Sequence, residues 1–268
     1  MLKTTDGLTL FAQNYLIDTP KASILLVHGL GEHCLRYAHV ARAFNDIGFN
    51  VYSFDLRGHG QSEGERAFVT DVQRYCDDVE AVYLTIPKNL PLYILGHSMG
   101  GLITLQFLLQ QKRPDVRAAI FSGAAIKAGA DITPFVIFIT KLLAQFFPKL
   151  QTTKLDPKSI SRDPETVQHY QGDPLIYRQG IKTGLGLALL KAMDEATARF
   201  EEFDYPMLVM HGGADKITNI EGSKQLYEKA KSTSKTLKIW DGAYHEIFNE
   251  TNRTEIIDFM TNWAQKTL

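Results

Sequence analysis

The chain has 268 residues, 44% of them hydrophobic, and its formal net charge is −1 at pH 7. This length fits one large α/β domain or two small domains, and the apolar content is sufficient for a globular core. A nearly neutral chain offers no basic surface for nucleic acid or acidic membranes. Cys34 and Cys76 are too few for a disulfide framework and lack metal-ligand spacing, so we expect free thiols, no metal and no cofactor.

Targeting signals are not evident in the sequence. Residues 1–7 lack the apolar core of a signal peptide. No uncharged apolar run is long enough to span a bilayer. We therefore expect a cytoplasmic protein.

The first elements are predicted to be short strands. Asp6 and Gly7 indicate a hairpin turn, with residues 8–15 as its second strand. The apolar run 23–27 is typical of a strand covered on both faces. It ends in a glycine-rich loop, residues 28–33, with the sequence His-Gly-Leu-Gly-Glu-His.

A second loop, residues 55–66, is rich in glycine and charge and follows a predicted strand over 49–54. It contains Asp55 and His59, which are residue types found in catalysis. We interpret them as parts of a hydrogen-bonded turn, because a better-placed acid and base follow downstream. We expect His28 to hold its own loop by hydrogen bonds. Helices are predicted over 36–45, 70–84 and 220–231 and in the C-terminal segment that includes Ile256, Ile257, Met260 and Trp263.

Residues 96–101, Gly-His-Ser-Met-Gly-Gly, form a G-x-S-x-G motif. An apolar strand, 92–95, precedes the motif and an apolar helix, 102–109, follows it, which is the setting of a nucleophile elbow. Such a turn needs glycine neighbours and exposes the serine hydroxyl at a helix N-terminus. The motif therefore predicts that Ser98 is a nucleophile.

A serine hydroxyl needs a base, and the base needs an acid to orient it. The predicted strand 207–210 leads to Asp215, and the predicted strand 237–240 leads to His245. Ser98, Asp215 and His245 thus occur in the chain order of an α/β-hydrolase triad. The backbone N–H groups of Leu30, in the loop after a central strand, and Met99 are the predicted oxyanion donors.

The region 126–203 interrupts the alternation of strands and predicts an inserted helical cap. Thr133 and Pro134 mark the start of a helix that is apolar on almost every side. Such a helix is either buried or lies in a lipid interface. A second apolar helix, 184–190, is expected to line an acyl tunnel. The side chains predicted to touch a membrane or micelle are Phe138, Ile139, Leu142, Phe146 and Phe147.

Six stretches match motifs of one known family. They are residues 28–33, 58–66, 96–101, 173–176, 235–239 and 242–245. On these motifs the chain resembles the monoglyceride lipases of the α/β-hydrolase fold, over nearly its whole length. The G-x-S-x-G part is common to many hydrolases, whereas the Gly-Gln-Ser-Glu-Gly-Glu-Arg sequence within 58–66 is more selective.

The resemblance also implies where the alcohol end of the substrate binds. Glu32 and Arg36 match family positions beside the glycerol-binding end, although a plain ion pair between them is an alternative. Tyr170, in the cap, is a further candidate for substrate binding. This chain differs from the mammalian enzymes of the family at two positions. It has Leu30 where they have an alanine, and Phe248 where they have a histidine that lines the glycerol end.

The residues and the resemblance together predict an α/β-hydrolase fold with a mostly parallel eight-stranded sheet and helices on both faces. The predicted core comprises 1–125 and 204–268, with the cap, 126–203, between the sixth and seventh strands. The expected activity is hydrolysis of a monoacylglycerol through an acyl-enzyme on Ser98. The alternatives are a lysophospholipase, a general carboxylesterase, or a non-catalytic binding protein with this fold.

Overall fold

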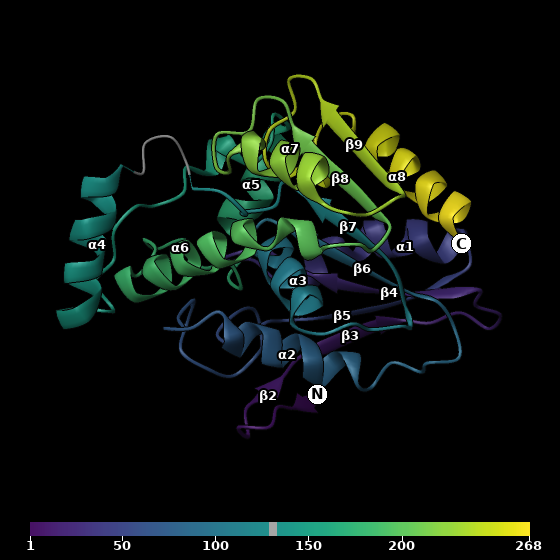
Figure 1. Cartoon of the computed structure of the whole chain (residues 1–268), viewed down its shortest axis with the longest axis horizontal. Helices are drawn as coiled ribbons and strands as arrows, with labels where there is room; N and C mark the ends of the chain where they lie inside the picture. Colours follow the sequence, from purple (N-terminus) through teal and green to yellow (C-terminus); the bar gives the residue numbers. More distant parts are fainter. Residues whose placement is uncertain (129–132) are drawn as a thin grey trace.

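A seven-stranded sheet forms the centre of the computed structural model, which describes residues 1–128 and 133–268 (Figure 1). Its strands are β3 (Ala12–Tyr15), β4 (Ala22–Val27), β5 (Phe49–Phe54), β6 (Leu92–His97), β7 (Val116–Ser122), β8 (Met207–Gly212) and β9 (Lys235–Trp240). They lie in the order β3-β5-β4-β6-β7-β8-β9, with β3 antiparallel to β5 and the other neighbouring pairs parallel. In such a sheet, ligands bind beyond the carboxyl ends of the strands.

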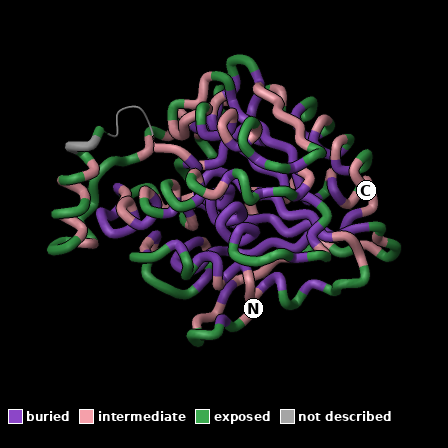
Figure 2. Tube along the Cα trace, in the orientation of Figure 1, coloured by how far each residue is buried: buried purple, intermediate pink, exposed green. Residues whose placement is uncertain are grey.

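The central strands are covered on both faces. Every residue of β4, β6 and β8 is buried, which explains their nearly continuous apolar sequences. Ile24 and Leu26 belong to one apolar cluster and Leu25 and Val27 to the other, as the two-residue period of a strand requires. Figure 2 shows this buried centre in purple.

Helices form a layer on each face of the sheet (Figure 1). One apolar cluster joins the sheet to α1 (Ala38–Asp46) and α8 (Arg253–Thr267). The opposite cluster joins it to α2 (Gln73–Tyr83), α3 (Met99–Gln110), α6 (Thr183–Ala198) and α7 (Ile220–Lys229). The predicted helices are confirmed, with ends shifted by a few residues, and the C-terminal helix buries Ile256 and Met260 as expected.

The N-terminal segment differs from the prediction. Residues 8–15 do not form one strand, because β1 (Leu2–Lys3) pairs with β2 (Thr9–Leu10) in a separate two-stranded sheet. The break comes at Phe11, whose amide donates a hydrogen bond to the Ser62 hydroxyl at 2.9 Å instead of continuing the hairpin. The fold class is confirmed, but the predicted count of eight strands in the main sheet is wrong by one.

Between β7 and β8 the chain is mainly helical. It contains α4 (Pro134–Phe146), α5 (Pro164–Gly172) and α6, with short 3₁₀ helices at Pro157–Ser159 and Phe200–Glu202. As predicted, α4 begins at Pro134, and the Thr133 hydroxyl accepts a hydrogen bond from the Val136 amide at 3.3 Å. Figure 1 shows α4 as the outermost helix, next to α6.

The predicted cap also includes residues 129–132, which lie outside the described residues, and its boundaries stay a prediction. Among the described helices, none has both the length and the apolar character needed to cross a membrane.

Candidate active site

Ser98 lies in a sharp turn between β6 and α3, as its motif predicts. Its φ is +53°, in the left-handed region that a residue other than glycine rarely adopts. A Cβ on Gly100 would lie 2.2 Å from the carbonyl oxygen of Val27, and a Cβ on Gly96 would lie 2.4 Å from the carbonyl oxygen of Gly100. Both distances are far below van der Waals contact, so only glycine allows this turn to form. The turn presents the Ser98 hydroxyl at the N-terminus of α3.

The structure brings the three predicted catalytic residues into one hydrogen-bonded chain. Ser98 Oγ is 2.8 Å from His245 Nε2, and His245 Nδ1 is 2.7 Å from Asp215 Oδ2. Asp215 follows β8 and His245 follows β9, so loops at the carboxyl edge of the sheet bring both to the end of β6. Ser98 and His245 are 8% and 5% exposed. The reacting atoms are thus almost closed off from bulk water.

Asp215 is a buried and ionised carboxylate. Its side chain is 0% exposed, and it accepts hydrogen bonds from the Thr218 amide at 3.0 Å and the Thr218 hydroxyl at 2.8 Å. Burial alone would raise the pKa of Asp215, but attraction to His245 and a hydrogen bond from His211 outweigh it and hold the pKa well below its usual range. A charged oxygen facing Nδ1 keeps the proton there. Nε2 is then free to accept the serine proton.

The pKa of His245 is raised above the ordinary value for histidine. Burial by itself would lower the pKa of His245, but the adjacent Asp215 carboxylate outweighs this effect. The ring of His97 lies 4.7 Å from the ring of His245, measured between centroids. Burial lowers the pKa of His97 to about 4, so His97 is neutral at physiological pH. Of these two rings, His245 is therefore the better base.

The predicted oxyanion donors lie beside Ser98. Met99 is the first residue of α3, Leu30 lies in the loop after β4, and both line a cavity at Ser98. The amide of Gly29, one residue earlier, donates to Glu32 Oε1 at 2.6 Å. Within the described part of the chain, neither the Leu30 nor the Met99 amide donates to a protein acceptor. Both N–H groups are therefore available to an oxyanion.

Three predicted substrate residues, Glu32, Arg36 and Tyr170, lie together, and a fourth residue, Glu246, joins them. Arg36 Nη1 donates to Glu32 at 2.8 Å, and both terminal nitrogens donate to Glu246 at 2.7 and 2.6 Å. The guanidinium carbon lies 5.3 Å from the centroid of the Tyr170 ring. The ion pair between Glu32 and Arg36 is thus present. Glu246 was not predicted from the sequence. The only indication of its role in the sequence is its position directly after His245.

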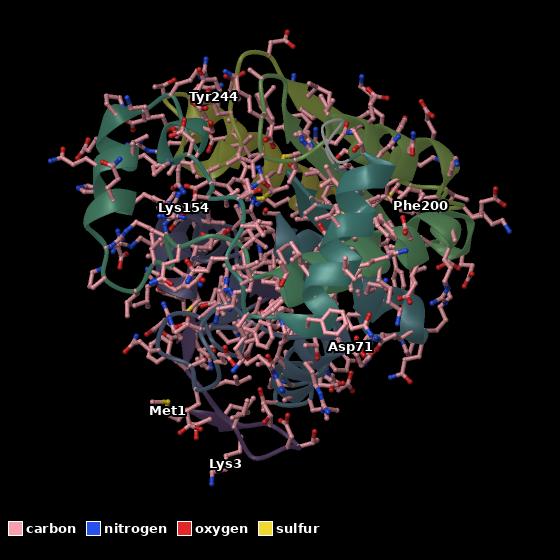
Figure 3. The ribbon with its side chains drawn as sticks, turned by 90° about the vertical axis from the view of Figure 1, so that its left-hand side faces the viewer. Met1, Lys3, Asp71, Lys154, Phe200 and Tyr244 are labelled. Carbon is pink, nitrogen blue, oxygen red and sulfur yellow. The ribbon has the colours of Figure 1, made fainter. Side chains whose placement is uncertain are left out.

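Two cavities meet at Ser98. The larger, about 440 Å³, lies against α4 and α6, and a volume of this size is ordinary for a small-molecule site. Its wall includes the apolar side chains of Val136, Ile139, Leu143, Leu189, Leu190 and Met193. Figure 3 views the molecule from this side, with α4 facing the reader. The predicted position of residues 184–190 along a cavity is confirmed.

The smaller cavity, about 20 Å³, holds about one water molecule. Its wall includes Ser98 and His245 as well as Glu32, Tyr170 and Glu246. Phe248, which stands where the mammalian enzymes have a histidine, does not line it. Phe248 is 2% exposed and packs in the core with α1 and α8.

The other candidate polar residues have structural roles, as predicted. Nε2 of the buried His28 accepts a hydrogen bond from the Leu56 amide at 2.9 Å. The Asp55 carboxylate accepts one from the Gln61 amide at 2.8 Å, and His59 is fully buried behind the same turn. Of these three residues, none lines a cavity at Ser98.

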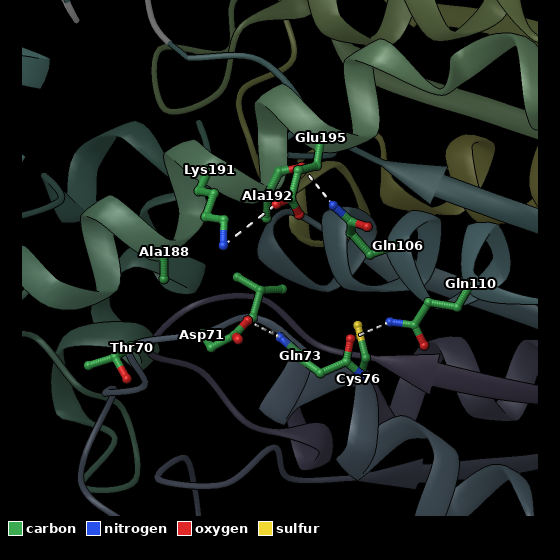
Figure 4. Close-up of a pocket in the computed structure, with 11 residues that line it drawn as sticks. Thr70, Asp71, Gln73, Cys76, Gln106, Gln110, Ala188, Lys191, Ala192 and Glu195 are labelled. Carbon is green, nitrogen blue, oxygen red and sulfur yellow. Dashed lines mark hydrogen bonds and ion pairs between the residues drawn. The ribbon is translucent and has the colours of Figure 1, made fainter.

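A separate cavity of about 80 Å³ lies between α2, α3 and α6 (Figure 4). Gln106, in the C-terminal half of α3, lines it and donates to the Ala192 carbonyl at 2.8 Å. Cys76 is the thiol in its wall, and burial raises the pKa of Cys76 to about 12. This thiol stays protonated at neutral pH, so the cavity is not a second nucleophilic site.

These features define an α/β hydrolase: a mostly parallel sheet, a serine in a strained turn after β6, an acid after β8 and a histidine after β9. The family model for "Serine aminopeptidase, S33" matches residues 18–252. A monoacylglycerol lipase of Mycolicibacterium smegmatis is 34% identical over 249 residues, which cover 91% of this chain and 88% of that protein.

Two solved structures are similar to the whole chain. The monoacylglycerol lipase of Paleococcus ferrophilus has a TM-score of 0.87 at 31% identity, over 97% of this chain and 100% of that one. A soluble variant of the monoglyceride lipase of Saccharomyces cerevisiae, in complex with a substrate analogue, has a TM-score of 0.89 at 26% identity. The match covers 100% of this chain and 94% of that one. This chain belongs to the serine aminopeptidase S33 family and, within it, to the monoacylglycerol lipases.

Proposed function

We propose that this protein hydrolyses the ester bond of monoacylglycerols and releases a fatty acid and glycerol. The observation that carries the proposal is the position of Ser98 where a large apolar cavity meets a small one whose wall includes Glu32, Tyr170 and Glu246. A monoacylglycerol has one apolar chain, which the large cavity can accommodate, and one small polar alcohol, whose hydroxyl groups would lie beside these polar side chains. The activity named for the relatives supports the same substrate class.

The proposed reaction uses the triad in two half-reactions. Ser98 Oγ attacks the ester carbonyl carbon while His245 Nε2 takes the hydroxyl proton, and Asp215 stabilises the charged imidazole. The carbon–oxygen bond to glycerol then breaks, and His245 returns the proton to the leaving oxygen. Water attacks the acyl-enzyme by the same route, giving one proton to His245, which passes it to Ser98 as the fatty acid leaves.

The Leu30 and Met99 amides would stabilise the oxyanion in both half-reactions. Each half-reaction passes through a tetrahedral intermediate whose oxygen carries negative charge. Donors fixed in the backbone need no rearrangement when this charge appears. The side chains of Glu32 and Tyr170 would hold the glycerol hydroxyl groups, and Arg36 would fix Glu32 in place through their ion pair.

We also propose that the cap, residues 126–203, docks on lipid surfaces through α4. Phe138, Phe146 and Phe147 are 61%, 64% and 63% exposed, and Leu142 is 47% exposed. Ile139 was also predicted to face outward, but it is only partly exposed and lines the large cavity. Each apolar side chain withdrawn from water contributes about 1.5–3 kcal/mol. Docking of this kind would allow a cytoplasmic protein to take a monoacylglycerol from a membrane.

Active-site labelling combined with a substrate panel tests the main proposal. A fluorophosphonate probe should label the protein, and peptide mass spectrometry should locate the label on Ser98. The panel pairs an octanoyl monoacylglycerol with a p-nitrophenyl ester of the same acyl chain. We expect labelling at Ser98 and cleavage of both esters. Labelling with cleavage of the p-nitrophenyl ester alone would overturn the substrate assignment, and no labelling at Ser98 would overturn the mechanism.

A further inference from the structure

Three charged groups beside the triad form a buried cluster: Glu32, Arg36 and Glu246. Glu32 and Glu246 are 4% and 6% exposed, and the Arg36 side chain is 11% exposed. Burial alone would raise the pKa of Glu32, but Arg36 outweighs it and lowers the pKa to about 2. Buried charges are expensive unless they are paired, so this cluster needs an explanation beyond stability.

The cluster has an excess of negative charge. Two carboxylates face one guanidinium, and Tyr170, which also lines the small cavity, is neutral because burial raises its pKa to about 12. Asp215 adds a further negative charge behind His245. The alcohol side of the site therefore has a net negative charge.

The cations nearby do not change this balance inside the small cavity. Arg178 donates to the Tyr170 carbonyl at 3.2 Å and lines a different cavity. Lys127 lines the large apolar cavity. Among the described residues that line the small cavity, none is an arginine or a lysine.

Glu246 also occupies the part of Arg36 that would otherwise bind an anion. A guanidinium recognises phosphate with two parallel N–H groups. In this structure both terminal nitrogens of Arg36 donate to the two oxygens of Glu246, at 2.7 and 2.6 Å. Asn249 Nδ2 donates to Glu246 at 2.9 Å and helps to keep the carboxylate in this position.

We propose that Glu246 determines leaving-group specificity: it masks Arg36 and keeps the small cavity negative, so that neutral alcohols are accepted and phosphate-bearing alcohols are rejected. This inference rests on the proposed ester hydrolysis at Ser98. Glu246 would thus distinguish a monoacylglycerol from a lysophosphatidic acid, which has the same acyl chain and ester but carries a phosphate on the glycerol. It also assigns a role to a residue that has no recognisable motif.

Paired substrates test the proposal. The purified full chain is assayed with octanoyl monoacylglycerol and with octanoyl lysophosphatidic acid, both below their aggregation concentrations. The measured quantity is the ratio of kcat/KM for the phosphate ester to kcat/KM for the neutral ester. For the wild type we expect this ratio to be below about one tenth, since at an effective dielectric of about 20 two unit charges closer than about 10 Å repel by more than a tenfold change in an equilibrium constant.

Substitutions at Glu246 then test its role. Glu246→Gln keeps the shape but removes the charge and weakens the hold on Arg36, whose Nη1 stays paired with Glu32. The ratio should therefore rise roughly ten- to a hundredfold, mainly through a lower KM for the phosphate ester. Glu246→Asp keeps the charge and should keep most of the discrimination. Glu221→Gln removes one charge from the exposed surface of α7 and should leave the ratio and the activity unchanged.

Three outcomes would overturn the inference. One is a wild type that cleaves both octanoyl esters equally, which would leave the proposed function intact. A second is a folded Glu246→Gln variant, checked by circular dichroism, whose ratio equals that of the wild type. The third is a Glu246→Asp variant that loses all discrimination, which decides the matter if Glu246→Gln does not fold. A wild type that cleaves neither ester would overturn the proposed function as well.

Discussion

Asp215 and His245 are two residues whose chemistry depends on each other. The carboxylate stays ionised although its side chain is 0% exposed, because the imidazole and several hydrogen bonds stabilise its charge. In return, the carboxylate raises the pKa of the imidazole against the effect of burial. A change at Asp215 should therefore affect both the amount of active tautomer and the pH at which the base works.

The first prediction concerns the choice of acid. Asp215→Asn should lower kcat roughly ten-thousandfold, because the amide does not hold the proton on Nδ1 of His245. Asp241, an exposed carboxylate after β9, is the matched control, and Asp241→Asn should have little effect. Steady-state kinetics with thermal denaturation separate chemistry from folding. The assignment is wrong if Asp241→Asn is the more damaging change at equal stability.

The second prediction is a pH profile of kcat/KM. His245 accepts a proton only when it is neutral, so activity should fall as pH drops through the pKa of His245. Since that pKa is raised, the midpoint of the acid limb should lie above the ordinary histidine value of about 6.5. Asp215→Asn removes the main raising interaction and should move the midpoint to lower pH. Full activity at pH 4 would contradict a histidine base.

At the scale of elements, the turn between β6 and α3 depends on close backbone contacts. The third prediction is that Gly100→Ala destabilises the protein by at least about 1–3 kcal/mol and lowers activity, because the new Cβ would lie 2.2 Å from the Val27 carbonyl in β4. Gly186→Ala in α6 is the control, since its nearest neighbour would be 3.8 Å away and alanine favours helix by about 0.5–1 kcal/mol. Equal denaturation midpoints for the two variants would refute this account of the turn.

The helix α4 is the element on which membrane docking depends. The fourth prediction is that Leu142→Ser combined with Phe146→Ser reduces liposome co-sedimentation and hydrolysis of liposome-borne monoacylglycerol, with little change on a soluble short-chain ester. Both side chains are exposed, so the free energy of unfolding of the variant should lie within about 0.5 kcal/mol of that of the wild type.

The matched control for α4 is Leu16→Ser combined with Leu84→Ser, two exposed apolar side chains outside the cap. This pair should leave both assays unchanged. If the α4 variant instead loses activity equally on both substrates and melts earlier, the helix is ordinary buried core. Equal losses in the control pair would mean that docking does not depend on α4.

At the scale of the whole molecule, the sequence predicted what depends on local pattern and chain order. Ser98 was evident because its motif lies between a strand and a helix. Asp215 and His245 followed because parallel strands bring their carboxyl ends to one edge. The break at Phe11 was missed because its cause, Ser62, is 51 residues away. Glu246 was missed for the same kind of reason, since Arg36 lies 210 residues away.

The most direct test of the account is the release of fatty acid and glycerol from a monoacylglycerol by the wild type and by Ser98→Ala. The Ser98 oxygen forms the covalent bond to the acyl group in the intermediate. Removing this hydroxyl should lower kcat by up to roughly a millionfold without changing the melting temperature. We expect rapid release of both products by the wild type and none above background by the variant. Substantial turnover by correctly folded Ser98→Ala protein would contradict the central claim.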